Sequence, residues 1–224
     1  MEMELKGVIF DMDGVIVNSE PLHVKFECDI LKSLGIDFPA EGFPEYAGLA
    51  MDKFWASLKE RYSLKQPVEE LLAYDTAMRA KAFRAQDHFD APAGVSGFIK
   101  SLKRAGIPLA LASSSHTMVI DAVLDKLGYR RYFDVVVSGF ELKNGKPAPD
   151  IFLYAADLLG TPHAGTLVVE DTANGVLAAR NAGMKCLGYQ NPTNPTRQDL
   201  SGADLVSGSF ESVTLDQLRK VMEG

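Results

Sequence analysis

The second half of the chain, from about residue 92 onward, alternates short apolar runs with segments of helical periodicity. The runs are rich in β-branched residues and show almost no alternation of apolar with polar side chains, which indicates strands buried on both faces. They are Leu109–Ala112, Val135–Val137, Leu167–Val169 and, near the end, Cys186-Leu187 and Leu205-Val206. This βαβα order is typical of a parallel sheet with helices on both faces, so we predict an α/β fold.

The segment that precedes this alternation differs, because it carries helical patterns and no convincing strand. The helix-like stretches are residues 22–34, 53–61 and 69–83. Connections from a strand to the next helix are short in α/β folds, so helices inserted directly after the first strand predict a separate helical cap. We place the core domain at residues 1–16 and 90–224, and the cap domain at residues 17–89.

Composition limits the classes of partner. The 224 residues include 46% hydrophobic and 24% charged residues, as in globular proteins, and the net charge of −7 argues against a basic nucleic-acid surface. The first residues do not resemble a signal peptide and no apolar run is long enough to span a membrane, so we expect a cytoplasmic protein. Cys28 and Cys186 match no metal-ligand spacing, and we interpret them as free thiols.

Polar residues follow the predicted strands. Asp11 and Asp13 come directly after the apolar run Val8-Ile9-Phe10. The other groups are Ser113-Ser114-Ser115 after the second strand, Lys146 beyond the third, and Glu170-Asp171-Thr172 at the end of the fourth. Each group alone has an ordinary structural explanation as turn chemistry, a helix cap or a surface charge. Together they lie at the carboxyl edge of one sheet, where ligands of such folds bind.

The chemistry of these groups predicts a metal-dependent reaction at phosphorus. Two clusters of acids at one point need a counter-ion, and Mg²⁺ binds through carboxylates together with phosphate oxygens. Lys146 and the groups near Ser113 are suited to holding phosphate oxygens. Asp11 is placed to attack phosphorus and form an aspartyl phosphate, and Asp13 to protonate the leaving oxygen and then activate water.

Four stretches carry a family pattern in order and at plausible spacing. DMDGVIVNSE, SSS, KPAPDIF and VVEDTANGVLAARNAGM together resemble the haloacid dehalogenase superfamily of phosphohydrolases, over nearly the whole chain. The resemblance implies a Rossmann-like parallel-sheet core with an inserted helical cap, an Asp11 nucleophile and an Asp13 acid/base. In having an acid at position 13, the chain resembles the phosphatase branch of the superfamily.

The same resemblance implies how phosphate and metal are held. Phosphate contacts come from the serine cluster and the lysine, namely Ser113, Ser114 and Lys146. Mg²⁺ is held by Asp11, the backbone carbonyl of Asp13 and Asp171, with Glu170 in or beside the metal's first shell.

Within the superfamily, the helical cap and the phrase NSEPLH resemble the β-phosphoglucomutase and sugar-phosphate phosphatase group. His23 matches a histidine of that group and is a possible substrate contact. Mutases of this group carry a cap arginine shortly after a glycine similar to Gly48, whereas this chain continues Leu49-Ala50-Met51. Three other cap cations, Arg79, Lys81 and Arg84, are possible substitutes, and each is also explained as a solvated helix charge.

We therefore predict a Mg²⁺-dependent phosphatase of a small phosphorylated metabolite, a sugar or polyol phosphate, acting as a monomer. Two alternatives stay open at this stage. One is a β-phosphoglucomutase-type phosphosugar mutase, which would use the same core residues. The other is a non-catalytic, receiver-like phospho-binding module, although receiver domains are shorter and have no cap.

Overall fold

The computed structural model describes residues 4–38, 51–194 and 197–223, and the chain divides into two compact units. The core unit comprises residues 1–19 and 88–224, and the cap unit comprises residues 20–87. The cap unit thus begins three residues later and ends two residues earlier than the cap predicted from the sequence. The N–H of Asn18 donates to the Asp90 carbonyl at 2.7 Å, which explains why the segment before residue 20 stays with the core.

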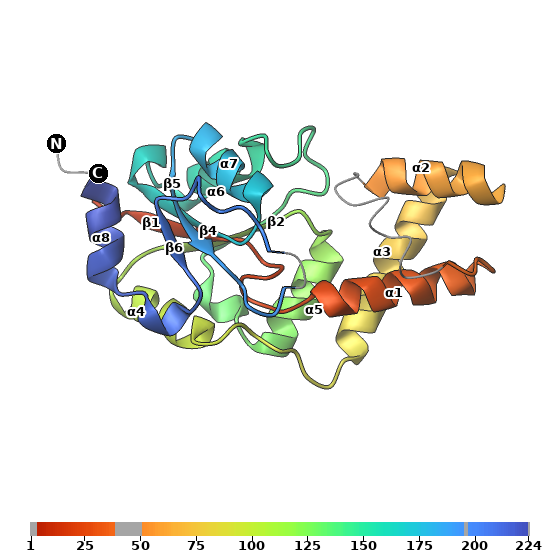
Figure 1. Ribbon diagram of the computed structural model, residues 1–224, viewed down its shortest axis with the longest axis horizontal. Coiled ribbons are helices and arrows are strands. Elements are labelled where there is room, and N and C mark those ends of the chain that lie inside the picture. The colour runs from red at the N-terminus through yellow and green to blue at the C-terminus, as the bar shows by residue number, and fades with distance from the viewer. Residues whose placement is uncertain (1–3, 39–50, 195–196, 224) are drawn as a thin grey trace. The chain divides into compact units, whose positions relative to one another are not determined.

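A six-stranded parallel sheet forms the centre of the core unit, in the order β3-β2-β1-β4-β5-β6 (Figure 1). Its strands are β1 Gly7–Phe10, β2 Leu109–Ser113, β3 Val135–Ser138, β4 Thr166–Glu170, β5 Lys185–Tyr189 and β6 Leu205–Ser207. The first strand in the sequence therefore lies between β2 and β4. Because parallel strands end at the same edge, this order brings the segments after β1, β2 and β4 together.

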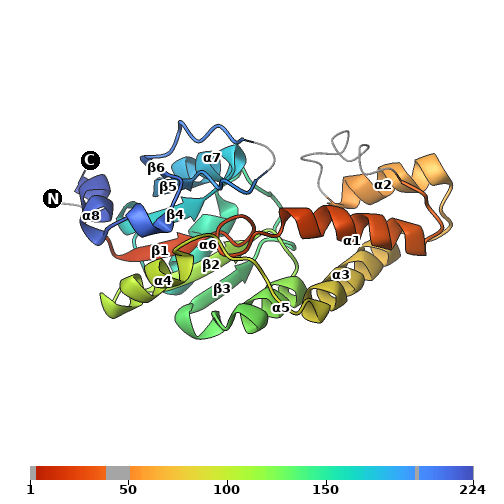
Figure 2. The same ribbon diagram turned by 60° about the horizontal axis from the view of Figure 1, so that its bottom comes forward.

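Helices cover both faces of this sheet (Figure 2). They are α4 Val95–Arg104, α5 Thr117–Leu127, α6 Asp150–Leu159, α7 Ala173–Asn181 and α8 Leu215–Glu223. On one face Ile9 and Val168 join a buried cluster with residues of α6 and α7. On the other face the Phe10 ring meets the edges of Phe98 and Phe133, each at a centroid distance of 5.9 Å. The prediction of an α/β, Rossmann-like core is confirmed.

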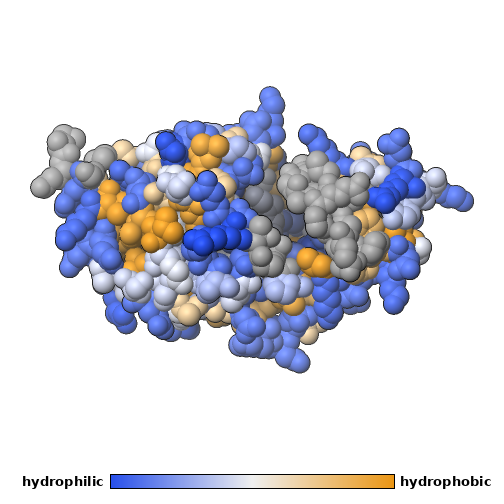
Figure 3. Space-filling model, in the orientation of Figure 1, coloured by the Kyte–Doolittle hydropathy of each residue, from blue (hydrophilic) through white to orange (hydrophobic). Residues whose placement is uncertain are grey.

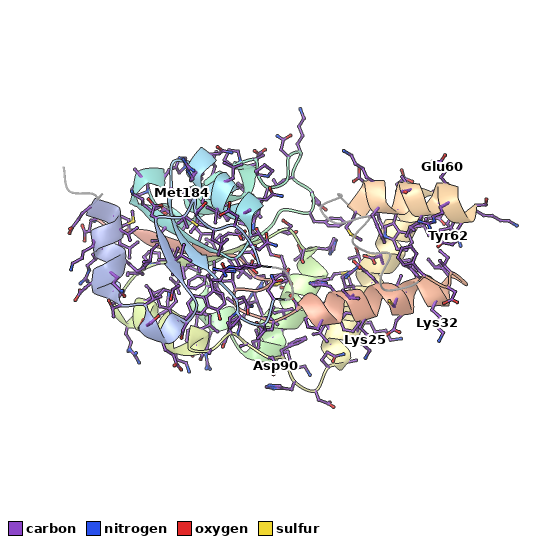
Figure 4. All side chains as sticks on the ribbon, in the orientation of Figure 1. Lys25, Lys32, Glu60, Tyr62, Asp90 and Met184 are labelled. Atoms are coloured by element: carbon purple, nitrogen blue, oxygen red, sulfur yellow. The ribbon has the colours of Figure 1, made fainter. Side chains whose placement is uncertain are left out.

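The cap unit contains helices and no strand among its described residues. Its helices are α1 Glu20–Ser33, α2 Met51–Tyr62 and α3 Val68–Ala85. Trp55 and Leu58 on α2 pack with Leu71 on α3 and Leu31 on α1 in a hydrophobic cluster that belongs to this unit alone. Charged side chains such as Lys32 project into solvent from the opposite side of their helices (Figure 4).

The surface is mainly hydrophilic, with small apolar areas in the visible face of the core unit (Figure 3). In the described part of the chain, no helix combines the length and the apolar character needed to cross a bilayer.

The position of β2 between two other strands, β3 and β1, gives a stability prediction. Leu111 is fully buried on β2, and replacing it with alanine removes apolar contacts and leaves a cavity, so Leu111→Ala should lower the free energy of unfolding by about 2–5 kcal/mol. Urea denaturation followed by circular dichroism measures the loss. Leu158→Ala, at a position 52% exposed, is the matched control and should change the stability by less than about 0.5 kcal/mol. Equal losses in the two variants would contradict the assignment of β2 to the core.

Candidate active site

Asp11 occupies the first position beyond the central strand β1. Phe10, the last residue of the strand, pairs in register with Leu111 of β2 and Val169 of β4. The Asp11 N–H donates to the Val169 carbonyl at 2.9 Å, which extends the ladder by one residue and fixes the backbone there. The residue is only 7% exposed, so its carboxylate lies at the carboxyl edge with little water around it.

Lys146 bridges two acids at this edge. Its Nζ donates to Asp11 Oδ1 at 2.5 Å and to Glu170 Oε1 at 2.6 Å, although the three residues are far apart in the sequence. Burial opposes the charge of the lysine, but these two carboxylates raise the pKa of Lys146 above its ordinary value, so the ammonium stays charged. The third N–H of this ammonium is left for a further acceptor, which a phosphate oxygen can supply.

Glu170 is held rigidly in this arrangement. Its side chain is 1% exposed, and its Oε2 accepts hydrogen bonds from the Thr172 N–H at 2.8 Å and the Thr172 hydroxyl at 2.9 Å. Gly175 lies so close that a Cβ there would overlap the Glu170 carboxylate. The absence of a side chain at position 175 therefore makes room for the acid that orients Lys146.

Asp171 carries a buried oxygen that lacks a partner. The residue is 4% exposed, and among the described residues no donor reaches its Oδ1. Burial, followed by repulsion from Glu170, Asp11 and Asp13, raises the pKa of Asp171 to about 8. Burial is also the main cause that raises the pKa of Asp11, against the attraction of Lys146. Both acids would be stabilised in their ionised form by a cation beside them.

Gly14 shows how closely the loop after β1 approaches Asp171. Its φ is +76°, a conformation that favours glycine, and a Cβ on this residue would overlap the Asp171 carboxylate. The loop that carries Asp13 is therefore packed directly against the acid at the end of β4.

These residues fit a hard divalent cation. The donor set predicted from the sequence consists of two carboxylates, from Asp11 and Asp171, and one backbone carbonyl, from Asp13. Oxygen donors of this kind suit Mg²⁺, and the partnerless oxygen of Asp171 is the type of group that a metal satisfies. Over residues 4–38, 51–194 and 197–223, no three His, Cys, Asp or Glu side chains alone form a metal-binding group, in keeping with a set that includes a main-chain oxygen.

Asp13 is oriented by two serine hydroxyls. Ser19 Oγ donates to its Oδ1 at 2.5 Å, and Ser115 Oγ donates to its Oδ2 at 3.2 Å. The sequence does not single out either serine as a functional residue: Ser19 is one letter of the stretch NSEPLH, and Ser115 is the last of three consecutive serines. The predicted phosphate contacts lie beside them. Ser113 is buried and accepts a hydrogen bond from the Ser115 N–H at 3.1 Å, whereas Ser114 is exposed.

The cap residues singled out from the sequence fall into different environments. Arg79 is 8% exposed, and its guanidinium contacts Asp75 at 3.1 Å, Glu27 at 3.4 Å and His23 Nδ1 at 3.0 Å. The expectation of a solvated charge is therefore wrong for Arg79.

The remaining cap candidates, Lys81 and Arg84, are exposed on α3. Gly48, Leu49 and Ala50, which bear on the missing mutase arginine, lie outside the described residues, and Met51 begins α2.

Comparisons with known proteins identify the family of this chain. A family model for haloacid dehalogenase-like hydrolases matches residues 5–183. The chain is 31% identical over 187 residues to the phosphorylated carbohydrates phosphatase of Thermotoga maritima, covering 81% of this chain and 83% of that protein. It is also 29% identical to protein SUPPRESSOR OF QUENCHING 1, chloroplastic, of Arabidopsis thaliana, over 96% of this chain, but it spans only 21% of the length of that protein.

A solved structure supports the fold. The crystal structure of CbbY from Rhodobacter sphaeroides in complex with phosphate superposes with a TM-score of 0.82 at 28% identity, covering 93% of this chain and 96% of that chain. With the family match over residues 5–183, the predicted resemblance and the prediction of a phosphoric monoester hydrolase are confirmed. The chain belongs to the haloacid dehalogenase-like hydrolase family.

Proposed function

We propose that this protein is a Mg²⁺-dependent phosphatase that hydrolyses a small sugar or polyol monophosphate through an aspartyl-phosphate intermediate. The observation that carries the proposal is the buried contact of Lys146 with Asp11 and Glu170, beside the partnerless oxygen of Asp171. This arrangement combines a nucleophile, a fixed cation and a carboxylate oxygen that a second cation can bind, at one edge of the sheet. An anionic phosphoryl group is the substrate that matches it.

Asp11 acts as the nucleophile in this proposal. Its carboxylate attacks phosphorus, a bond forms between that oxygen and phosphorus, and the bond from phosphorus to the alcohol oxygen of the substrate breaks. Lys146 holds Asp11 through one N–H and directs its remaining N–H to a phosphate oxygen. Ser113 and Ser114, at the end of β2, hold the other phosphate oxygens through hydroxyl or backbone N–H groups.

Asp13 transfers the protons. It gives a proton to the departing alcohol oxygen, and in the second half of the reaction it takes a proton from the water that hydrolyses the aspartyl phosphate. The two serine hydroxyls on its carboxylate, from Ser19 and Ser115, orient it, whereas Lys146 holds Asp11. The nucleophile and the acid/base are thus two aspartates with separate hydrogen-bond partners.

Asp11, the Asp13 carbonyl and Asp171 hold Mg²⁺ in this proposal, with Glu170 beside them. When bound, the metal neutralises charge on the phosphoryl group and on the acids around it.

The substrate class follows from the relatives and from the cap. The Thermotoga maritima relative is named for phosphorylated carbohydrates, which supports a sugar or polyol phosphate. A mutase must also hold a second phosphate, for which an arginine fork is best suited. Arg79 is a poor candidate, because Asp75 and Glu27 already compensate its charge. His23, Arg79 and Lys81 stay possible substrate contacts, and a receiver-like module is disfavoured because the family is one of hydrolases.

The proposal also includes three properties that are expected from the sequence. They are a monomeric state, a cytoplasmic location and the absence of nucleic-acid and membrane partners. The net charge of −7 supports the absence of a nucleic-acid partner.

Metal removal and Asp11→Asn test the nucleophilic centre. Chelation with EDTA should abolish the hydrolysis of p-nitrophenyl phosphate, and added Mg²⁺ should restore it. Asp11→Asn should lower the rate by more than about a thousandfold, because an amide is a poor nucleophile and a weaker metal ligand. Release of p-nitrophenolate measures both effects. An Asp11→Asn protein that retained the wild-type rate would exclude the proposed mechanism.

Asp13→Asn tests the acid/base role. The rate of phosphate ester hydrolysis should fall about 10²–10⁴-fold, which is the range for a lost general acid or base. Binding of Mg²⁺ and of a phosphate analogue such as vanadate should persist, since the backbone carbonyl of residue 13 remains. Isothermal titration of both ligands provides the comparison. If metal affinity were lost in proportion to the rate, Asp13 would have to be reassigned to metal binding.

A third experiment separates phosphatase from mutase. With β-glucose 1-phosphate, Mg²⁺ and a bisphosphate primer, we expect any turnover to release inorganic phosphate without forming glucose 6-phosphate. The physical reason is that the buried Arg79 is held by Asp75 and Glu27 and is not free for a second phosphate. Coupled assays measure both products. Glucose 6-phosphate that accumulated faster than free phosphate would establish the mutase alternative.

A further inference from the structure

Asn191 lies after β5, beyond residues 5–183 that match the family model, yet it contacts the loop that follows Asp13. The residue is 6% exposed. Its Nδ2 donates to the Gly14 carbonyl at 2.8 Å and to Asn18 Oδ1 at 2.9 Å. A side chain 177 positions away from Gly14 thus holds two points of the same loop.

The orientation of this amide is determined by its other end. Asn191 Oδ1 accepts hydrogen bonds from the Thr193 N–H at 2.9 Å and from the Thr193 hydroxyl at 2.7 Å. A backbone N–H can only donate, so the atom facing it must be the oxygen, and the NH₂ group must face Gly14 and Asn18. Both hydrogens of the amide therefore have acceptors, and the side chain has no reason to rotate.

The two residues that accept from Asn191, Gly14 and Asn18, are neighbours in the sequence of the two residues that form the Asp13–Ser19 hydrogen bond. Gly14 directly follows Asp13, and Asn18 directly precedes Ser19, whose hydroxyl donates to Asp13 Oδ1 at 2.5 Å. Ser19 is fully buried, so its hydroxyl has little freedom to turn elsewhere. Asn191 thereby holds the Gly14 backbone on one side of the Asp13–Ser19 contact and the Asn18 side chain on the other.

Backbone hydrogen bonds make the loop between these ends stiff. The Gly14 N–H donates to the Val17 carbonyl at 2.8 Å, and the Ile16 N–H donates to the Met12 carbonyl at 2.9 Å. A loop closed in this way moves as a unit. Together with the bonds of the Asp11 and Asn18 N–H groups to the Val169 and Asp90 carbonyls, the attachment at Asn191 determines where the whole loop, and with it the Asp13 carboxylate, lies.

We propose that Asn191 is a positioning residue for Asp13, acting through the Gly14 carbonyl and the Asn18 side chain. The inference rests on the proposed role of Asp13 as the acid that protonates the leaving oxygen. A displacement of a reacting group by about 1 Å costs about 100-fold in rate. The amide of Asn191 is thus expected to matter for catalysis although it contacts no reacting atom.

The experiment compares two aryl esters that differ in the leaving group. Phenyl phosphate releases a phenol of pKa about 10, which needs a proton in order to depart. In p-nitrophenyl phosphate the nitro group stabilises the departing anion, so a proton is needed less. The quantity measured is kcat/KM, which covers the steps up to departure of the alcohol. Loss of a well-placed acid should therefore lower kcat/KM more for phenyl phosphate than for p-nitrophenyl phosphate.

Two substitutions at Asn191 test the contact, and one elsewhere serves as the control. Asn191→Asp keeps the size and an acceptor for Thr193 but removes both donors, and Asn191→Ala removes the whole amide. In both Asn191 variants we expect kcat/KM for phenyl phosphate to fall about 10–100-fold. The fold-decrease in kcat/KM for p-nitrophenyl phosphate should be smaller than this by a factor of about five or more. Asn174→Ala, at an exposed amide on α7, should change neither value by more than about twofold.

Asn18→Ala keeps the test decisive if the Asn191 variants are poorly folded. It removes one of the two acceptors and leaves the Gly14 contact, so it should produce a smaller loss with the same dependence on the leaving group. An equal loss for both esters in the Asn191 and Asn18 variants, or no loss, would overturn the inference.

Asp13→Asn, assayed in parallel, distinguishes this failure from failure of the proposed function. Asp13→Asn should lower kcat/KM more for phenyl phosphate than for p-nitrophenyl phosphate. If it does and the Asn191 variants do not, Asn191 has no positioning role while the function of Asp13 stands. If Asp13→Asn itself shows no dependence on the leaving group, the acid role of Asp13 is wrong, and the inference falls with it.

Discussion

The contact of Lys146 with Asp11 and Glu170 is the interaction on which the centre depends. Asp11 and Glu170 are each less than a tenth exposed, and like charges at such a place oppose each other's ionisation. Removing the lysine would leave buried acids without compensation, which is far costlier than losing a surface ion pair. The charge of Lys146 therefore allows Asp11 and Glu170 to be buried together, and in the proposed function the remaining acid, Asp171, is a ligand for the metal.

The burial of the strands explains why the fold could be predicted from the sequence. Runs such as Leu109–Ala112 are apolar on both sides because helices cover both faces, and this shows in the sequence as missing alternation. The strand order follows less directly, but any parallel sheet gathers the carboxyl ends at one edge. Asp11, Lys146 and Glu170 could therefore be brought together by reasoning, although 135 positions separate the lysine from Asp11.

The parts that could not be predicted depend on tertiary pairing of ordinary polar residues. Ser19 stands in the stretch DMDGVIVNSE, but the pattern does not show that its hydroxyl reaches Asp13. Asn191 belongs to a residue type that is common in turns and loops, and it is far from this stretch in the sequence. Arg79 shows the same limit in the cap. Its pairing with Asp75 has the spacing of an ordinary surface pair on a helix, and only the contacts with Glu27 and His23 on another helix show that it is buried.

The residues that react and the residues that hold them have different physical requirements. In the proposed mechanism Asp11 and Asp13 must be carboxylates because their chemistry is attack and proton transfer, whereas the groups around them need only the right shape and donors. Gly14 and Gly175 serve by having no side chain, since a Cβ at either position would overlap Asp171 or Glu170. Asn191 serves by donating two hydrogen bonds from a distant loop. Because such roles depend on which distant segments meet in space, they are recognised from contacts in the folded chain.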